Sequence, residues 1–147
     1  MKFKNSMIIV ADLGELKGYR IRKNEAIVGN KIKSSYTLKL HNNISYIDAR
    51  KKLHEVVTDN AGRFGQHIAE EHNLETERKR RSLEDLADDI NKIVEKEQPK
   101  QLFLAFPQEL NTQLLNLLSP AIKTLLVKNL TSNLVKINKE KLLSYFE

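Results

Sequence analysis

Eight basic side chains in the middle of the chain have the chemistry and the grouping to contact the phosphates of a nucleic acid. They form two runs with one arginine between them, so that cations flank a glycine-containing loop. Each Lys or Arg that neutralises a phosphate releases a condensed counterion, and this release supplies much of the binding affinity. The candidate nucleic-acid-binding residues are Arg50, Lys51, Lys52, Arg63, Arg78, Lys79, Arg80 and Arg81.

The second basic run, residues 78–81, also has a purely structural interpretation. It lies in a predicted helix, with Glu77 before it and Glu84 after it at helical pairing distances. Such a run can form a solvated helix face laced with ion pairs, without any ligand. Phosphate contact and helix-face pairing both stay open, and the scarcity of aromatic residues between the cations argues against a base-stacking platform.

The segment Gly62-Arg63-Phe64-Gly65-Gln66 is predicted to be a loop. The stretch 59–66 is rich in turn-forming residues and holds two of the chain's five glycines. Composition alone is typical of an ordinary connector before a helix.

The same segment resembles the Gly-Arg-Gly-Gly-Gln loop in the catalytic domain of archaeal and eukaryotic peptide-chain release factors. The resemblance extends to bacterial relatives of that domain, which include proteins named as required for attachment to host cells. Further similarities to the bacterial group are Ala11-Asp12 and Lys128-Asn129-Leu130-Thr131. The resemblance implies a ribonuclease H-like fold over nearly the whole chain.

The resemblance also implies roles for loop residues. Gln66 and the backbone of Gly65 would be the catalytic groups that help a water molecule attack the ester of peptidyl-tRNA. Gly62 and Phe64 would shape the loop, and Phe64 stands where the release factors have the first glycine of their triplet. A bulky side chain there restricts backbone freedom that glycine provides.

From these features we expect a module associated with the ribosome or tRNA. It could be a peptidyl-tRNA hydrolase or a translation rescue or regulatory factor. The alternative is a non-enzymatic interaction protein of the host-attachment family, for which a protein partner is possible. We expect no membrane partner.

Metal chemistry is the less favoured interpretation of the other polar residues. His67 and His72 lack a known zinc spacing, even with Glu71 as a third ligand. Asp12, Asp48 and Asp88 could imitate the carboxylates of a two-metal nuclease. We favour a turn aspartate and solvated carboxylates, and expect no metal and no cofactor.

Composition is that of a globular protein with an anionic partner. The 147 residues are 40% hydrophobic and 30% charged, with a net charge of +6. Residues 1–60 hold 12 Lys and Arg against 6 Asp and Glu, and the remainder is balanced. No cysteine is present. That absence fits a reducing compartment, so we expect a cytoplasmic location.

The pattern of apolar residues predicts one α/β domain over residues 1–147. Strands are expected at 6–11, 16–21, 36–40, 102–106 and 125–127, with 25–29 as a short strand or loop. Helices are expected at 45–53, 74–96, 107–118 and after Pro120, and a last one capped by Asn138. This order predicts a mixed five-stranded sheet that begins as an antiparallel meander and continues through βα crossovers.

Overall fold

A five-stranded mixed sheet forms the centre of the protein. The computed structural model describes residues 5–46 and 67–147, and for residues 67–76 the backbone alone. The strands are β1 (Ser6–Ala11), β2 (Glu15–Val28), β3 (Lys31–Ser45), β4 (Gln101–Ala105) and β5 (Leu126–Leu130), in the order β3-β2-β1-β4-β5. β2 and β3 follow β1 as an antiparallel meander, and β4 and β5 run parallel to β1. The predicted fold class is confirmed.

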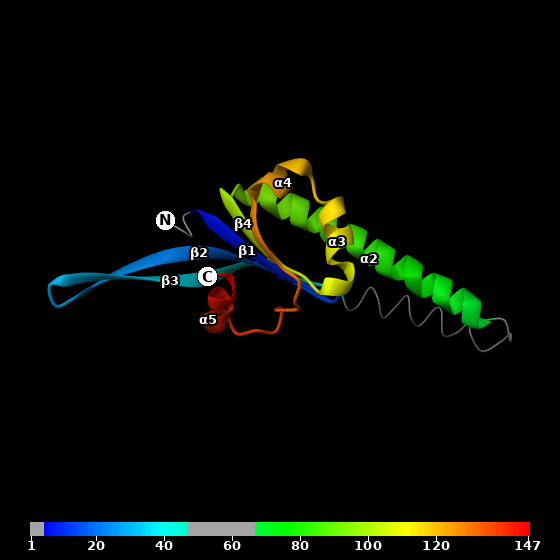
Figure 1. Cartoon of the computed structure of the whole chain (residues 1–147), viewed down its shortest axis with the longest axis horizontal. Coiled ribbons are helices and arrows are strands. Elements are labelled where there is room, and N and C mark those ends of the chain that lie inside the picture. Colours follow the sequence, from blue (N-terminus) through cyan, green and yellow to red (C-terminus); the bar gives the residue numbers. More distant parts are fainter. Residues whose placement is uncertain (1–4, 47–66) are drawn as a thin grey trace.

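Helices cover both faces of this sheet (Figure 1). On one face lie α2 (His67–Glu97), α3 (Gln108–Leu117) and α4 (Pro120–Leu125). On the other face lie the short α5 (Lys139–Leu142) and the 3-10 helix η1 (Leu143–Phe146). As predicted, α2 ends just before Pro99, and the Asn138 side chain caps α5 by accepting from the backbone N–H of Glu140.

The alternation of side chains along β1 explains why its sequence is a continuous apolar run. Met7 and Ile9 pack against the α2 face, whereas Ile8 and Val10 pack against the α5 face. A strand that is covered on both faces has no solvent side to accommodate polar residues. β4 is the second such strand, and it pairs with β1 directly.

The main difference from the sequence-based prediction is the length of the β2–β3 hairpin. The strands predicted at 16–21, 25–29 and 36–40 are parts of one hairpin that spans residues 15–45. Its turn has Gly29 at a φ of 64°, followed by Asn30 without a positive φ, which is the pattern of a type II′ turn. The outer hairpin is exposed on both faces, so its sequence lacks the alternation by which a half-buried strand is recognised.

Two helix boundaries also differ from expectation. α2 begins at His67, seven residues before the predicted start at Leu74. Ser45, where a short helix was expected to begin, instead ends β3. The rest of that expected helix and the predicted loop at 59–66 lie outside the described residues.

Candidate functional site

The outer half of the β2–β3 hairpin projects from the body of the protein as an arm, which we define as residues 22–37 (Figure 1). The pairing of β1 with β2 ends at Met7 and Arg20. Beyond that point β2 has β3 as its one strand neighbour in the described part of the chain. The arm therefore presents both of its faces to solvent, and nearly all of its side chains are exposed.

One face of the β2–β3 hairpin carries five cations and no carboxylate, three of the cations on the arm and two at its base. Side chains at every second position share a face, and paired residues on neighbouring strands share it too. The register pairs Arg20 with Lys39, Arg22 with Thr37, Ala26 with Lys33 and Val28 with Lys31. This surface, called the cationic face below, consists of Arg20, Arg22, Lys31, Lys33 and Lys39 together with polar residues such as Asn24 and Ser35.

Local contacts hold part of the cationic face in place. Arg20 donates to the side-chain oxygen of Asn5 at 2.7 Å, and the Asn24 amide donates to the Thr37 hydroxyl at 2.8 Å. Both contacts use neutral acceptors. Among the residues that the structure describes, no ion pair neutralises any of the five cations of this face.

The opposite face of the arm is aliphatic at its tip. Ile27 pairs with Ile32, and these side chains are 81% and 69% exposed. The charged pair on this face, Lys23 and Glu25, is joined at 3.2 Å. The arm's one carboxylate thus neutralises a cation on the aliphatic face, which leaves the cationic face with its full charge.

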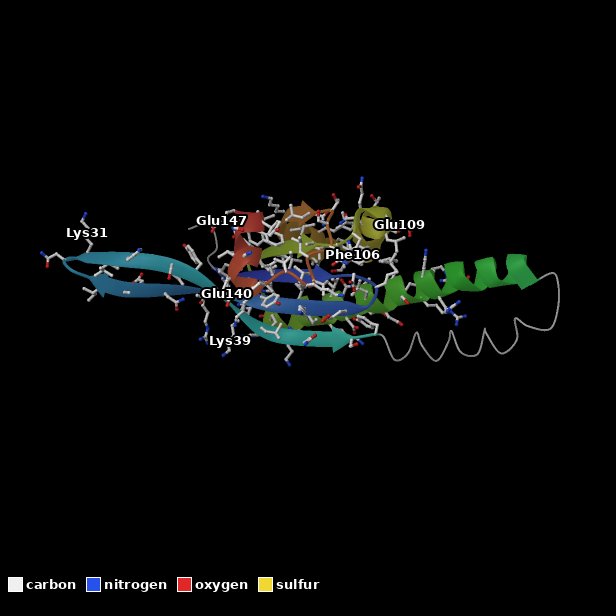
Figure 2. All side chains as sticks on the ribbon, turned by 90° about the horizontal axis from the view of Figure 1, so that it is seen from below. Lys31, Lys39, Phe106, Glu109, Glu140 and Glu147 are labelled. Carbon is white, nitrogen blue, oxygen red and sulfur yellow. The ribbon has the colours of Figure 1, made fainter. Side chains whose placement is uncertain are left out.

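The cationic face turns as it runs outward, because a two-stranded ribbon twists strongly. Lys39 lies at its inner end and Lys31 near the tip, and Figure 2 shows these two side chains pointing to opposite sides of the arm. The five cations thus follow a helical path around the ribbon.

The predicted basic run on α2 is largely engaged in ion pairs. Arg80 bonds Glu77 at 2.8 Å and Glu84 at 2.6 Å, and Arg81 lies 3.8 Å from Glu77. The hydrogen bond between Arg80 and Glu77 lowers the pKa of the Glu77 carboxyl and raises the pKa of the Arg80 guanidinium. Lys79 lies 3.9 Å from Glu109. These contacts are the ion pairs expected if the basic run forms a solvated helix face. Phosphate contact by Arg78, Lys79, Arg80 and Arg81 stays a prediction.

The other predicted site residues lie outside the described part of the chain. They are Arg50, Lys51, Lys52, Gly62, Arg63, Phe64, Gly65 and Gln66. Their predicted roles in RNA binding and in water positioning stay predictions.

Asp12, considered above as a metal ligand, fixes the turn after β1. One carboxylate oxygen accepts from the backbone N–H of Gly14 at 2.7 Å and of Glu15 at 2.8 Å. The other accepts from the Asn133 amide at 3.0 Å. Among the side chains that the structure describes, those of residues 5–46 and 77–147, no three of His, Cys, Asp or Glu are grouped to hold a metal ion. Next to this turn, towards Phe106 and Glu109 in Figure 2, lies a shallow hollow of about 320 Å³.

Replacing Asp12 by alanine should lower the free energy of unfolding by about 1–2 kcal/mol, because three N–H groups lose a charged acceptor. Asn133→Ala is the matched control. It removes the contact to one carboxylate oxygen and the neutral bond that Asn133 accepts from the backbone N–H of Val135, but it leaves the turn intact, so its cost should be smaller. Urea unfolding of the two variants measures both costs. An Asp12→Ala variant as stable as the wild type would contradict this account of the turn.

Sequence reasoning missed the cationic face. The available signal is the excess of Lys and Arg in residues 1–60, which indicates that the amino-terminal half faces an anion but does not single out the hairpin. Arg20 and Lys39 are far apart in sequence and become neighbours only through the register of β2 and β3.

No helix within the described residues is long and apolar enough to cross a membrane.

Comparison with known proteins identifies the family. No curated protein matches the chain significantly. The profile of the family described as "Protein required for attachment to host cells" matches residues 7–146, which include all of the sheet except its first residue and the helices on both of its faces. The chain therefore belongs to the family of proteins required for attachment to host cells.

Proposed function

We propose that this protein is a non-enzymatic binding module of the host-attachment family, and that its arm binds RNA. The observation that carries the proposal is the cationic face, where five Lys and Arg side chains share one side of the β2–β3 hairpin, along the arm and at its base, without a carboxylate among them. Phosphate is the ligand chemistry that such a surface suits best.

The shape of the arm supports the proposal. Its strands extend roughly 20–25 Å beyond the body, at about 3.3 Å per residue. An RNA helix has a wide and shallow minor groove, across which proteins contact 2′-hydroxyls and phosphates, and a two-stranded ribbon can lie along it. Its cations can then approach the phosphate strands on either side, because the twist turns the cationic face around the ribbon.

Structured RNA of the ribosome or of tRNA is the partner class we propose. The basic first part of the sequence and the resemblance of the 62–66 loop to a ribosome-directed segment both support this choice. Ester hydrolysis is no part of the proposal, because it would depend on Gln66 and Gly65, which lie outside the described residues.

The direct test is the salt dependence of RNA binding by the purified chain. The logarithm of the association constant should fall linearly with the logarithm of salt concentration, with a slope of roughly −3 to −5 for five phosphate contacts. Raising the salt from about 50 to 200 mM should then weaken binding roughly 50- to 1000-fold. Fluorescence anisotropy with labelled tRNA measures the slope. Binding that salt does not weaken, or no binding at low salt, would refute the proposal.

A further inference from the structure

A groove runs along the outer edge of β3, at the base of the arm. Residues 36–40 of β3 form one side of it, and α5 and η1 form the other. It encloses about 640 Å³, within the usual range for a ligand site. Figure 1 shows α5 beside β3, and Figure 2 shows Glu140 and Glu147 on the helical side of this groove.

We infer that an extended peptide segment of a protein partner binds in this groove as an added strand along β3. Within the described part of the chain, β3 is the last strand on its side of the sheet. In an antiparallel strand, alternate residues direct their backbone N–H and C=O groups away from the paired neighbour. An edge of this kind is the template on which proteins add an extended peptide by main-chain hydrogen bonds.

The two faces of the edge specify which side chains the peptide carries. On the α5 side, Tyr36, Leu38 and Leu40 of β3 line the groove with Leu143, and Leu40 is 43% exposed. The β3 wall of the groove is therefore apolar on this side. On the opposite face, Arg22 and Lys39 stand on the inner end of the cationic face. Cross-strand neighbours of opposite charge stabilise a pair of strands. The peptide therefore alternates aliphatic residues towards α5 with acidic residues towards Lys39, and Arg22 on β2 adds positive charge one strand further in.

Charged side chains on the helical side add a further preference. Glu140 lies in α5 and Glu147 follows η1, and within the described residues no ion pair neutralises either of them. Lys139 also lines this side, so the two carboxylates leave it with one net negative charge. Basic residues on the aliphatic side of the peptide would complement that charge. Five residues of the peptide pair with residues 36–40 of β3 over roughly 17 Å, and one basic residue at each end brings its length to about seven.

A second copy of the chain fits this edge less well than a free segment. Pairing two β3 edges in antiparallel fashion would bring Lys39 of one copy close to the same residue of the other. Like charges on directly opposed strand positions are destabilising. A peptide with acidic residues at these positions meets no such repulsion.

The test uses the full chain and the peptide acetyl-Lys-Glu-Val-Glu-Val-Glu-Lys-amide. A peptide of the same composition in the order Glu-Glu-Glu-Val-Val-Lys-Lys serves as the control, because its aliphatic and acidic residues no longer alternate. We expect the alternating peptide to bind at least ten times more tightly, by calorimetry, and to slow amide hydrogen exchange in residues 36–40. Equal affinity for the two peptides, or unchanged exchange in β3, would overturn the inference.

Two charge-reversal variants separate this site from the RNA-binding arm. Lys39→Glu should weaken peptide binding about tenfold, whereas Lys31→Glu, on the same face but outside the groove, should leave it within about twofold. Both variants should weaken RNA binding, so failure of one proposal leaves the other standing. If the two variants weakened peptide binding equally, the assignment of the peptide to this groove would be wrong. A dimer of the wild-type chain that Lys39→Glu alone changes would show that a second copy occupies the edge, and would overturn the peptide assignment.

Discussion

Replacing Arg22, Lys31, Lys33 and Lys39 by glutamine is expected to weaken RNA binding several hundredfold at low salt. Four charge-assisted phosphate contacts are lost, at roughly 1 kcal/mol each, and each 1.4 kcal/mol is a factor of ten in affinity. The slope of the salt dependence should become shallower by about three to four, since fewer counterions are released. Fold stability should stay near that of the wild type, because these side chains are exposed.

The matched control is a second quadruple variant, in which Lys92, Lys96, Lys123 and Lys136 become glutamine. These lysines are also exposed, and the net charge falls by the same amount, but they lie on α2, on α4 and after β5. We expect this variant to bind RNA with an affinity within about threefold of the wild type, because salt screens surface charges that lie far from the bound RNA. Equal losses in the two variants would mean that overall charge, and not the arm, determines the affinity.

Phe103→Ala is expected to have the largest effect on stability. Phe103 lies in the middle of β4, is 1% exposed, and meets Phe146 edge to face with ring centroids 5.8 Å apart. Truncating a buried phenylalanine to alanine costs about 3–5 kcal/mol, because the apolar contacts are lost and a cavity remains. This is a large fraction of the 5–15 kcal/mol that holds a typical domain folded. Urea unfolding followed by circular dichroism should show a much lower midpoint, or no folded state at all.

Leu117→Ala provides the comparison for that variant. Leu117 is an apolar residue on α3, but 41% of it is exposed, so its removal opens no enclosed cavity. Leu117→Ala should lower the free energy of unfolding by less than about 1 kcal/mol. If the two variants were equally stable, the α5 face of the sheet would not be the close-packed core that the contacts of Phe103 and Phe146 describe.

Burial explains which parts of the fold could be predicted from the sequence. β1 and β4 are enclosed on both faces, so their runs of apolar residues have one simple interpretation. The apolar positions of α2 recur at helical spacing from Leu83 to Val94, because one side of that helix packs on the sheet. Pro99 and Asn138 marked helix boundaries through local chemistry alone.

The candidate site could not be predicted in the same way, since its parts come together through strand register. Nothing local indicates that Lys33 shares a face with Arg22, because this depends on the turn at Gly29 and on the pairing of β2 with β3. The groove depends on an even longer connection, since α5 follows β3 by almost 100 residues. Surface function built from distant segments leaves little trace in a single sequence.

The parallel pairing of β1 with β4 constrains the way the chain is made. Ser6 and Gln101 are bonded neighbours separated by 95 residues, and at roughly 5–20 residues per second the ribosome needs about 5–20 s to synthesise that interval. During this time β2 and β3 can already cover one edge of β1, while its other edge stays open in the nascent chain. Exposure of this aliphatic strand to aggregation is therefore governed by the rate of translation and by chaperones, and not by the stability of the finished fold.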